Sequence, residues 1–587
     1  MCGIIGYRGA NNPVNILVEG LRSLEYRGYD SAGIAIMNDR RIQIIKSVGK
    51  IDDLEKLIEK ANLINSNIGI GHTRWATHGE VSVNNAHPHR VGKVTLVHNG
   101  IIENSSELRD RLLDEGVKLT SNTDTEVACA IINKYYTGDP IVAINKAILE
   151  FRGSYAFCIM FEGIDKLYAI RKDSPLIVGF NDSEFYVSSD TSAIVAYTNK
   201  YFLLEKNEIC EIGDRISVTY NGEKVYKDIL TSEILSDSKD KGTYEHFMLK
   251  EIMEEPIVLE KIINRYCNDL SLLPDLNEYE EIHIVACGSA MYAGMIGKSL
   301  LEENTNLKVS CEVASEYRYR KINYDRDTLV VLVSQSGETA DTIAAMRKAK
   351  LAGVDTLAIV NVHDSTIARE CKMKIFIEAG VEVAVATTKA YMLQVAILAL
   401  LSYKASLKYN SDNIELLDEI KLLPELVRNV LDRRDIYYNI ALDIYNNEHL
   451  FFIGRKIDYA ICLEGSLKLK EVSYIHSEAY QAGELKHGTI SLIDDDIFVF
   501  SIITDDDIFE KSISNLEEVR ARGAKCIVIS NKKVNVDCCK IQVPKVNKFF
   551  QPLLVVPCLQ LIAYEVAKIR CCDIDKPRNL AKSVTVE

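Results

Sequence analysis

One pattern of strands and helices occurs twice in the chain, and this repeat constrains the fold more than any other feature of the sequence. The first copy begins at Glu281 with EIHIVACGSAMYAGMIGKSLLEE and continues with DTLVVLVSQSGETADTIAAMRKAKLAG and VDTLAIVNV. The second begins about 170 residues later with EHLFFIGRKIDYAICLEGSLKLKEVS, and matching runs follow in the same order. Strands, glycine turns and helices in alternation indicate a parallel sheet covered by helices. The repeat therefore predicts two copies of one doubly wound α/β lobe.

The first 222 residues follow a different rhythm. Short apolar runs such as KVTLVHNG, SYAFCIMF and RISVTY alternate with Gly, Asn and Asp turns, and few helical stretches interrupt them. Runs of this length and spacing are typical of stacked antiparallel strands, so we expect an α+β sandwich ahead of the two lobes. The expected boundaries are 2–222 for the sandwich, 223–255 for a linker, 256–425 and 426–575 for the lobes, and 576–587 for a C-terminal tail.

Charge and cysteine content narrow the possible functions. A formal net charge of −15 argues against nucleic acid or an anionic membrane as the main partner, because both require a basic surface. The fifteen cysteines include no C-x-x-C pair and follow no signal peptide, which is typical of reduced thiols in a cytoplasmic protein. The most apolar helix-like run, Ala390 to Tyr403, is too short to span a bilayer and is expected to be a buried core helix.

The first lobe carries a candidate anion site. SQSGET, from Ser334 to Thr339, follows the strand LVVLV and opens a helix. Its hydroxyl groups, its glycine and the free N–H groups of the helix start suit a phosphate. The G-x-x-x-x-G-K of a nucleotide P-loop is absent, so a sugar phosphate fits better than ATP. The alternative is a serine-rich helix cap without function. The second lobe has SIITDDD at the matching place, which favours a functional role in the first.

The second lobe carries its own charged cluster in LEGSLKLKEVSYIHSEAYQAGELKHG. Lys468 and Glu471 share one face of the expected helix, and His487 follows in the next segment. A solvated helix with surface ion pairs is one interpretation. The other is proton transfer between adjacent sugar carbons, which requires a carboxylate with a cation close by.

Five of the eleven histidines and the only tryptophan, Trp75, lie between His72 and His98. A zinc site is disfavoured, because the segment has no H-E-x-x-H pair and no cysteine at ligand spacing. Arg74 beside Trp75 could be a structural stacking pair, and Asn99-Gly100 could be an ordinary turn.

Cys2, taken together with these residues, suggests a single catalytic site. Removal of Met1 would leave a thiol and a free α-amine on one residue, and an amine that titrates near pH 8 can act as the base for its own thiol. A thiolate that attacks an amide needs an oxyanion hole, which the Asn99 side chain and the Gly100 N–H could form. Arg74 and Asp124 could bind the carboxylate and the ammonium of an amino acid. The implied substrate is glutamine.

The motifs MCGIIGY, LEYRGYDSAG, GHTRWATHGE, NAHPH, VHNGIIEN and TDTEV together resemble the glutaminase domain of class II amidotransferases. These are N-terminal nucleophile hydrolases with a four-layer αββα fold. CGS, SQSGET, LEGSLKLKE, GELKHG and the ending PRNLAKSVTVE resemble paired sugar-isomerase (SIS) domains. The resemblance covers essentially the whole chain. It implies an enzyme that moves the amide nitrogen of L-glutamine to D-fructose 6-phosphate and releases glucosamine 6-phosphate and glutamate.

The resemblance also implies roles for individual residues. Cys2 would be the nucleophile, with Asn99 and Gly100 as the oxyanion hole, and Trp75 would gate an ammonia channel. Lys582 would form a Schiff base with the sugar, Glu471 would move the proton with help from Lys468, and His487 from a neighbouring subunit would open the ring. The expected glutamine-binding residues are Arg74, Trp75, Thr77, His78 and Asp124. The expected sugar-phosphate-binding residues are Ser289, Ser334, Gln335, Ser336, Thr339, Val385 and Ala581.

The resemblance implies at least a homodimer and no metal or organic cofactor. The chain departs from the family pattern at three places: Ala290 replaces a threonine, Thr489 replaces a proline, and Thr387 replaces a serine. An amidotransferase for another sugar phosphate is therefore an alternative. A sugar-phosphate-binding regulator is a further alternative, but no basic helix-turn-helix is visible, and a sensor would not need Cys2, Arg74 and Asp124 together.

Overall fold

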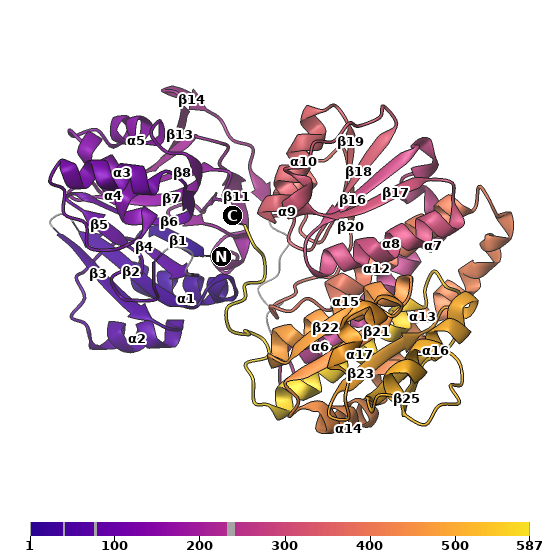
Figure 1. The fold of residues 1–587 in the computed structure, drawn as a ribbon. Helices are drawn as coiled ribbons and strands as arrows, with labels where there is room; N and C mark the ends of the chain where they lie inside the picture. The colour runs from indigo at the N-terminus through magenta and orange to yellow at the C-terminus, as the bar shows by residue number, and fades with distance from the viewer. Residues whose placement is uncertain (1, 39–40, 76–78, 232–240, 586–587) are drawn as a thin grey trace. The chain divides into compact units, whose positions relative to one another are not determined.

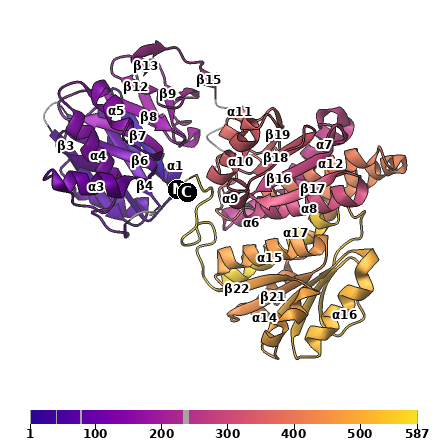
Figure 2. The same cartoon turned by 45° about the horizontal axis from the view of Figure 1, so that its top comes forward.

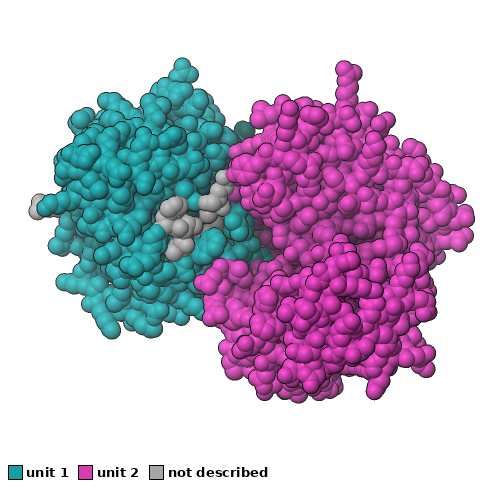
Figure 3. Space-filling model, in the orientation of Figure 1, with its two compact units in different colours: residues 1–240, 581–587 teal, residues 241–580 magenta. Residues whose placement is uncertain are grey.

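The computed structural model describes residues 2–38, 41–75, 79–231 and 241–585 (Figure 1). Compactness divides the chain into two units, which are coloured separately in Figure 3. The first unit contains residues 1–240 together with 581–587, and the second contains residues 241–580. Each unit has its own sheets and its own buried core, so each is described separately below.

The first unit contains two sheets in which all named strand pairs are antiparallel. The first sheet has the strand order β15-β11-β9-β10-β1-β4-β2-β3 and the second β14-β13-β12-β8-β7-β6-β5. The strands of the first sheet are β1 (Gly3–Arg8), β2 (Ser31–Asn38), β3 (Arg41–Val48), β4 (Ile68–Arg74), β9 (Ile177–Phe180), β10 (Phe185–Ser188), β11 (Lys200–Leu203) and β15 (Leu230–Thr231). Those of the second are β5 (His89–Val91), β6 (Val94–Ile102), β7 (Gly153–Phe161), β8 (Leu167–Lys172), β12 (Ile209–Ile212), β13 (Ile216–Tyr220) and β14 (Glu223–Val225).

The helices of this unit cover the outer faces of the two sheets, as Figure 1 shows, and Figure 2 gives a second view of the same unit. The first sheet packs on α1 (Pro13–Leu24) and α2 (Ile51–Lys60). The second packs on α3 (Ser105–Asp114), α4 (Asp124–Tyr135) and α5 (Pro140–Ile148). A third cluster of buried side chains, which includes Ile4, Val97 and Cys158, fills the space between the sheets. These four layers confirm the αββα fold that the resemblance implied.

The order of the strands explains how residues far apart in sequence meet. β1 is a central strand, bonded on either side to β10 and β4, and the register pairs Gly3 with Thr73. β6 of the facing sheet contacts both β1 and β4. The beginning of β1, the end of β4 and the middle of β6 therefore meet between the two sheets.

The second unit contains two five-stranded parallel sheets, and the strand order confirms the repeat in the sequence. The orders are β17-β16-β18-β19-β20 and β22-β21-β23-β24-β25, so the first strand of each lobe is second in its sheet. The strands are β16 (Glu281–Ala286), β17 (Lys308–Val313), β18 (Thr328–Ser334), β19 (Asp355–Val360) and β20 (Met373–Phe376), then β21 (His449–Gly454), β22 (His476–Gln481), β23 (Phe498–Ile503), β24 (Lys525–Ser530) and β25 (Cys539–Gln542).

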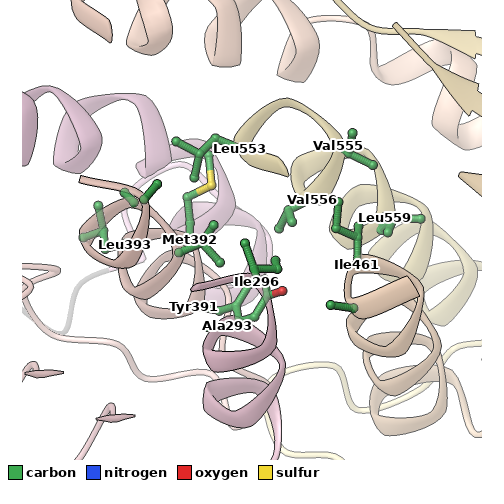
Figure 4. Close-up of a cluster of buried hydrophobic side chains, with 14 of the residues drawn as sticks. Ala293, Ile296, Tyr391, Met392, Leu393, Ile461, Leu553, Val555, Val556 and Leu559 are labelled. Atoms are coloured by element: carbon green, nitrogen blue, oxygen red, sulfur yellow. The ribbon is translucent and has the colours of Figure 1, made fainter. Parts of the chain in front are cut away.

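Four helices join the two lobes into one core. Figure 4 shows apolar side chains that meet from α8 (Ser289–Asn304), α12 (Lys389–Ser406), α15 (Ile457–Ser473) and α17 (Pro552–Ile569). Around them lie α6 (Phe247–Met253), α7 (Glu255–Asn268), α9 (Ala314–Tyr317), α10 (Ala340–Leu351), α11 (Thr366–Glu370), α13 (Leu417–Leu431), α14 (Arg434–Ile444) and α16 (Phe509–Arg520). Because α8 belongs to the first lobe and α15 to the second, their packing brings the ends of both sheets close together.

Two of the core helices are mostly apolar and almost entirely buried. α12 contains Ala390 to Tyr403, and every residue of that stretch is buried, which confirms it as a core helix. α17 has the length and composition of a membrane span, with a mean hydropathy of 1.5, but 89% of its residues are buried in the protein.

The segment 223–255, expected as a linker, contains regular structure. β14 pairs with β13, and β15 pairs with β11, so both short strands extend the sheets of the first unit. α6 lies at the other end of the segment, and the Asp575 carboxylate accepts hydrogen bonds of 2.9 Å from the Phe247 and Met248 amides at its first turn.

Truncation of the core at Ile461 should destabilise the second unit. Its side chain is fully buried in α15, so Ile461→Ala should lower the free energy of unfolding by about 2–5 kcal/mol. Far-UV circular dichroism in denaturant measures the loss. Leu351→Ala removes a side chain that is 91% exposed and serves as the control. An equal effect of the two substitutions would contradict the assignment of Ile461 to the core.

Candidate active sites

Cys2 lies immediately before β1, where hydrogen bonds fix the backbone. The Gly3 amide donates to the Thr73 hydroxyl at 3.1 Å, and the Ile4 amide donates to the Ser189 hydroxyl at 3.0 Å. The Trp75 amide donates to the Cys2 Sγ at 3.3 Å. Burial raises the pKa of the Cys2 thiol, although the Arg74 guanidinium acts in the opposite direction. A thiol of this kind needs a base before it can attack an amide.

Asn99 and Gly100 lie on β6, which faces Cys2 from the second sheet. The Asn99 Nδ2 donates to the Cys2 carbonyl oxygen at 2.9 Å. Gly100 has a φ of +121°, and a Cβ at this position would lie 2.3 Å from the Ser154 carbonyl oxygen. Only glycine fits this backbone. The structure thus places an amide donor beside Cys2, on a strand whose next residue cannot carry a side chain.

Two buried charges lie near the Cys2 sulfur. Arg74 is the last residue of β4 and is 4% exposed, and its guanidinium donates to the Gly79 and Glu80 carbonyl oxygens at 3.2 and 3.3 Å. Asp124 is the first residue of α4, and its carboxylate accepts from the Ile102 amide at 2.9 Å. Both charges affect the pKa of the Cys2 thiol, Arg74 lowering it and Asp124 raising it.

The structure therefore brings Cys2, Arg74, Asn99 and Asp124 into one site, with the Trp75 backbone beside them. Thr77 and His78, the other expected glutamine-binding residues, lie outside the described residues.

The remaining histidines of the amino-terminal cluster form a buried group beneath this site. The rings of His72 and His87 stack with centroids 4.0 Å apart, and His89 lies 4.9 Å from His87. Burial lowers the pKa of His72 to about 3 and the pKa values of His87 and His89 well below the usual range. These histidines are therefore neutral near pH 7. In the described part of the chain, no three His, Cys, Asp or Glu side chains are arranged to hold a metal ion.

The candidate sugar-phosphate residues lie at the carboxyl ends of two adjacent parallel strands. β16 lies between β17 and β18 in the sheet. The strand that follows β16 in sequence, β17, pairs with one edge of β16, and the next strand, β18, pairs with its other edge. Ligands of doubly wound sheets bind at such a switch point. Ser289 begins α8 after β16, and Ser334 ends β18. Both serines are buried.

The SQSGET turn has the shape of an anion cradle. The Gly337 and Glu338 amides donate to the Ser334 and Ser336 hydroxyls at 3.1 and 3.2 Å, and Gly337 has a φ of +64°. Thr339 is the N-cap residue of α10, but its hydroxyl does not accept from the helix amides and instead lies 3.2 Å from the hydroxyl of Ser334. These hydroxyls therefore lie together at the start of the helix.

The switch point of the second lobe is occupied by charges of the protein itself. The Lys456 ammonium lies 3.3 Å from the Asp505 carboxylate and 3.2 Å from that of Glu303. Asp458 is buried, and its carboxylate accepts from the Thr504 amide at 2.9 Å. Carboxylates hold the place that an anion occupies in a site of the first kind, in agreement with the contrast between SQSGET and SIITDDD.

In the charged cluster on α15, Lys468 is buried and Glu471 is half-buried, which contradicts the interpretation of this pair as a surface ion pair on a solvated helix. Lys468 is 1% exposed and forms a short ion pair with Glu471. Although burial alone would lower the pKa of Lys468, the carboxylates of Glu464 and Glu471 raise it above its usual value.

Glu464 is a candidate that sequence reasoning missed. Its carboxylate lies 3.5 Å from the Lys468 ammonium, one helical turn away. Burial raises the pKa of Glu464 to about 7, while Lys468 and the nearby Ser289 hydroxyl act in the opposite direction. A buried acid that titrates near neutral pH beside a candidate sugar site is itself a candidate proton carrier. The i, i+4 spacing to Lys468 was the signal that could have found it.

The loop before α12 completes this site. The Glu382 carboxylate accepts from the Thr388 and Ala390 amides at 3.0 and 3.1 Å, and it contributes to the raised pKa of Lys468. The Val385 amide donates to the Asp575 carbonyl oxygen at 3.0 Å. Val385 therefore belongs to a loop whose anchoring carboxylate is close to α15.

Three residues expected in the sugar site, His487, Ala581 and Lys582, do not lie in it within the second unit. His487 is exposed at the end of a short 3-10 segment, Glu484–His487. Ala581 and Lys582 are grouped with the first unit, whereas Glu471 belongs to the second.

Family comparisons agree with both sites. The model of the glutamine amidotransferase domain matches residues 72–196, and the SIS domain model matches residues 275–403 and 443–569. Together with the folds above, these matches define a glutamine amidotransferase domain joined to two SIS domains.

Curated relatives identify the family more closely. Proteins named glutamine–fructose-6-phosphate aminotransferase [isomerizing] from Clostridium tetani, Caldanaerobacter subterraneus and Thermus thermophilus are 44%, 43% and 40% identical to this chain. Each alignment covers 100% of both chains. The chain belongs to the glutamine–fructose-6-phosphate aminotransferase (isomerizing) family.

Solved structures resemble the second unit. The C-terminal domain of glucosamine-fructose-6-phosphate aminotransferase from Francisella tularensis is 36% identical, with a TM-score of 0.54, and its match covers 58% of this chain and 100% of that one. A putative tagatose-6-phosphate ketose/aldose isomerase from Clostridium novyi is 19% identical with a TM-score of 0.51, covers 58% and 93%, and shares the fold alone.

The buried neutral histidines should make the first unit sensitive to acid. Between pH 6.5 and about 3, His72 binds a proton in the unfolded chain but not in the folded one, so stability falls as pH falls. His72 alone should reduce the free energy of unfolding by about 1.4 kcal/mol per pH unit in this range. Fluorescence of the single tryptophan, Trp75, measures unfolding of this unit.

The variant His72→Phe should show a shallower dependence on pH than the wild type, because it removes one of the groups that must take up a proton. His476→Leu removes an exposed ring and should keep the wild-type slope. Equal slopes for His72→Phe and the wild type would contradict a neutral, buried His72.

Proposed function

We propose that this chain is an enzyme that transfers the amide nitrogen of L-glutamine to D-fructose 6-phosphate and yields D-glucosamine 6-phosphate and L-glutamate. The observation that carries the proposal is the presence of two complementary sites in one chain. One places Cys2 beside the Asn99 carboxamide, and the other places the buried Lys468–Glu464 pair close to Ser289. The names of the full-length relatives support the same reaction.

The first site would cleave glutamine. Once Met1 is removed, the α-amine of Cys2 accepts the proton of its own thiol, and the sulfur attacks the side-chain amide carbon. The Asn99 Nδ2 and the Gly100 N–H stabilise the negative charge on the amide oxygen. Arg74 holds the substrate carboxylate, Asp124 holds the ammonium, and ammonia leaves. Water then hydrolyses the thioester and releases glutamate.

The second site would join ammonia to the sugar. The phosphate is bound by the hydroxyls and amides of the SQSGET turn, at the amino end of α10. Lys582 forms a Schiff base at C2 of the open-chain ketose, and ammonia replaces the lysine. Glu471 takes a proton from C1 and returns it to C2, while the C1 hydroxyl gives up its proton and the nitrogen gains one, which converts the ketose imine into an aldose that carries the amine at C2. Lys468, held between the carboxylates of Glu464 and Glu471, places a positive charge beside the group that moves the proton.

Two further parts of the proposal concern the assembly and its location. The exposed position of His487 supports a homodimer or larger oligomer in which this histidine opens the sugar ring in a neighbouring site. All fifteen cysteines are free thiols, which supports a reducing compartment such as the cytoplasm.

The full-length protein should form glucosamine 6-phosphate when it receives glutamine and fructose 6-phosphate together. A product assay with a panel of ketose and aldose phosphates tests this expectation and the alternative substrate suggested by Ala290. If the protein forms product only from a different sugar phosphate, that sugar is the substrate and fructose 6-phosphate is not.

Cys2→Ala should abolish glutamate release but leave sugar isomerisation, whereas Cys129→Ala, at a buried thiol on α4, should keep both.

Loss of the carboxylate at Glu471 should stop the sugar reaction only. Glu471→Gln should lower the rate of glucosamine 6-phosphate formation by about 10²–10⁴-fold, the contribution typical of general base catalysis, with glutamate release unaffected. Glu517→Gln, on an exposed face of α16, is the matched control. Full product formation by Glu471→Gln would show that another group moves the proton, and Glu464 would be the next candidate.

A further inference from the structure

The hydrogen bonds of His72 determine which of its two nitrogens carries the proton. His72 lies on β4 and is fully buried. Its Nε2 lies 2.9 Å from the His98 carbonyl oxygen and 3.1 Å from the Asn99 Oδ1. A backbone carbonyl oxygen can only accept, so Nε2 must be the protonated nitrogen that donates. The atom of Asn99 that faces His72 must then also be an acceptor.

Two fixed groups therefore determine how the Asn99 carboxamide is oriented. On one side, the Nε2–H of His72 requires the carboxamide oxygen. On the other, the Cys2 carbonyl oxygen lies 2.9 Å away and requires the Nδ2–H₂ group. The carboxamide satisfies both in one orientation only. If it rotated by 180°, two acceptors would meet at Cys2 and two donors would meet at His72.

We propose that His72 is a positioning residue for glutamine cleavage, which acts by holding the donor side of the Asn99 carboxamide towards the reacting carbonyl group. The inference rests on the proposed function of the first site. An oxyanion hole works because its donors are already oriented when negative charge develops. A carboxamide that could turn would present its own oxygen to the oxyanion for part of the time and would repel it.

The other nitrogen of His72 shows that the imidazole ring lowers the stability of the folded protein. Nδ1 is buried, and among the described residues it has no hydrogen-bond partner. An unsatisfied buried acceptor lowers stability, and native proteins contain few of them. An apolar ring would avoid this cost and could still stack on His87, which lies 4.0 Å away. What an apolar ring cannot supply is the Nε2–H that Asn99 accepts.

Steady-state kinetics of glutamate release by the full-length protein tests this role. His72→Phe keeps a planar ring without the donor, and His72→Leu removes both, so one variant serves if the other fails to fold. Either should lower kcat by about 10- to 100-fold, with the KM for glutamine within about twofold of wild type. His72→Gln, whose side-chain amide restores a donor, should recover most of the loss. His87 belongs to the same buried group of histidines but has no hydrogen bond to Asn99. His87→Leu is therefore the matched control and should keep kcat.

A double-mutant cycle separates positioning from a general structural effect. Asn99→Ala alone should lower kcat by about 10²–10³-fold, and addition of His72→Phe should then cost little more, because His72 acts through Asn99. Losses that multiply, an equal loss in His87→Leu, or a wild-type kcat in His72→Phe would each overturn the inference. Wild-type protein that releases no glutamate would instead overturn the proposed function, so the two failures are distinguishable.

Discussion

The hydrogen bond from the Asn99 carboxamide to the Cys2 carbonyl joins the two sheets of the first unit at the place where glutamine would be cleaved. Cys2, the proposed nucleophile, lies just before a strand of one sheet, and Asn99 and Gly100, the proposed oxyanion donors, lie on a strand of the other. Their distance is therefore set by the packing of the two sheets and by the apolar cluster between them. A displacement of one sheet by a fraction of the distance between strands would separate the thiol from its donors. The packing of the four layers therefore sets the distance between the groups that the proposed reaction requires.

Burial determines the ionisation of the groups in both sites. In the first, it keeps the histidines neutral, so that His72 can act as a fixed donor and no positive charge forms beneath Asn99. In the second, it favours the neutral form of Glu464, whereas Lys468 stays charged because carboxylates flank it. Removal from water gives each charge a larger effect on its neighbours than the same pair would have at the surface.

The sequence predicted the fold class and most of the residues near Cys2, but it could not supply the contacts between strands. The repeat predicted parallel lobes because the period of strand and helix is local, whereas the fusion of α8, α12, α15 and α17 into one core depends on contacts distant in sequence. The histidine cluster was visible as a composition, yet its role depends on the approach of β4 to β6 from different sheets. Glu464 was missed because its spacing to Lys468 has the same appearance on an exposed helix, and only burial separates the two cases.

The two lobes share one strand order but carry different polar groups: the first has hydroxyl and amide donors, and the second has carboxylates and a lysine. Electrostatic repulsion explains this separation. A sugar phosphate brings a dianion, which favours amide and hydroxyl donors such as those of the SQSGET turn. Carboxylates such as Glu464 and Glu471 would repel that dianion if they lay in the same turn. With the acids on α15 of the other lobe, a phosphate bound at the SQSGET turn would hold one end of a hexose while the carboxylates would face the other. The packing of α8 against α15 brings Glu464 close to Ser289, so the two lobes can supply opposite kinds of group to one site without placing them in the same turn.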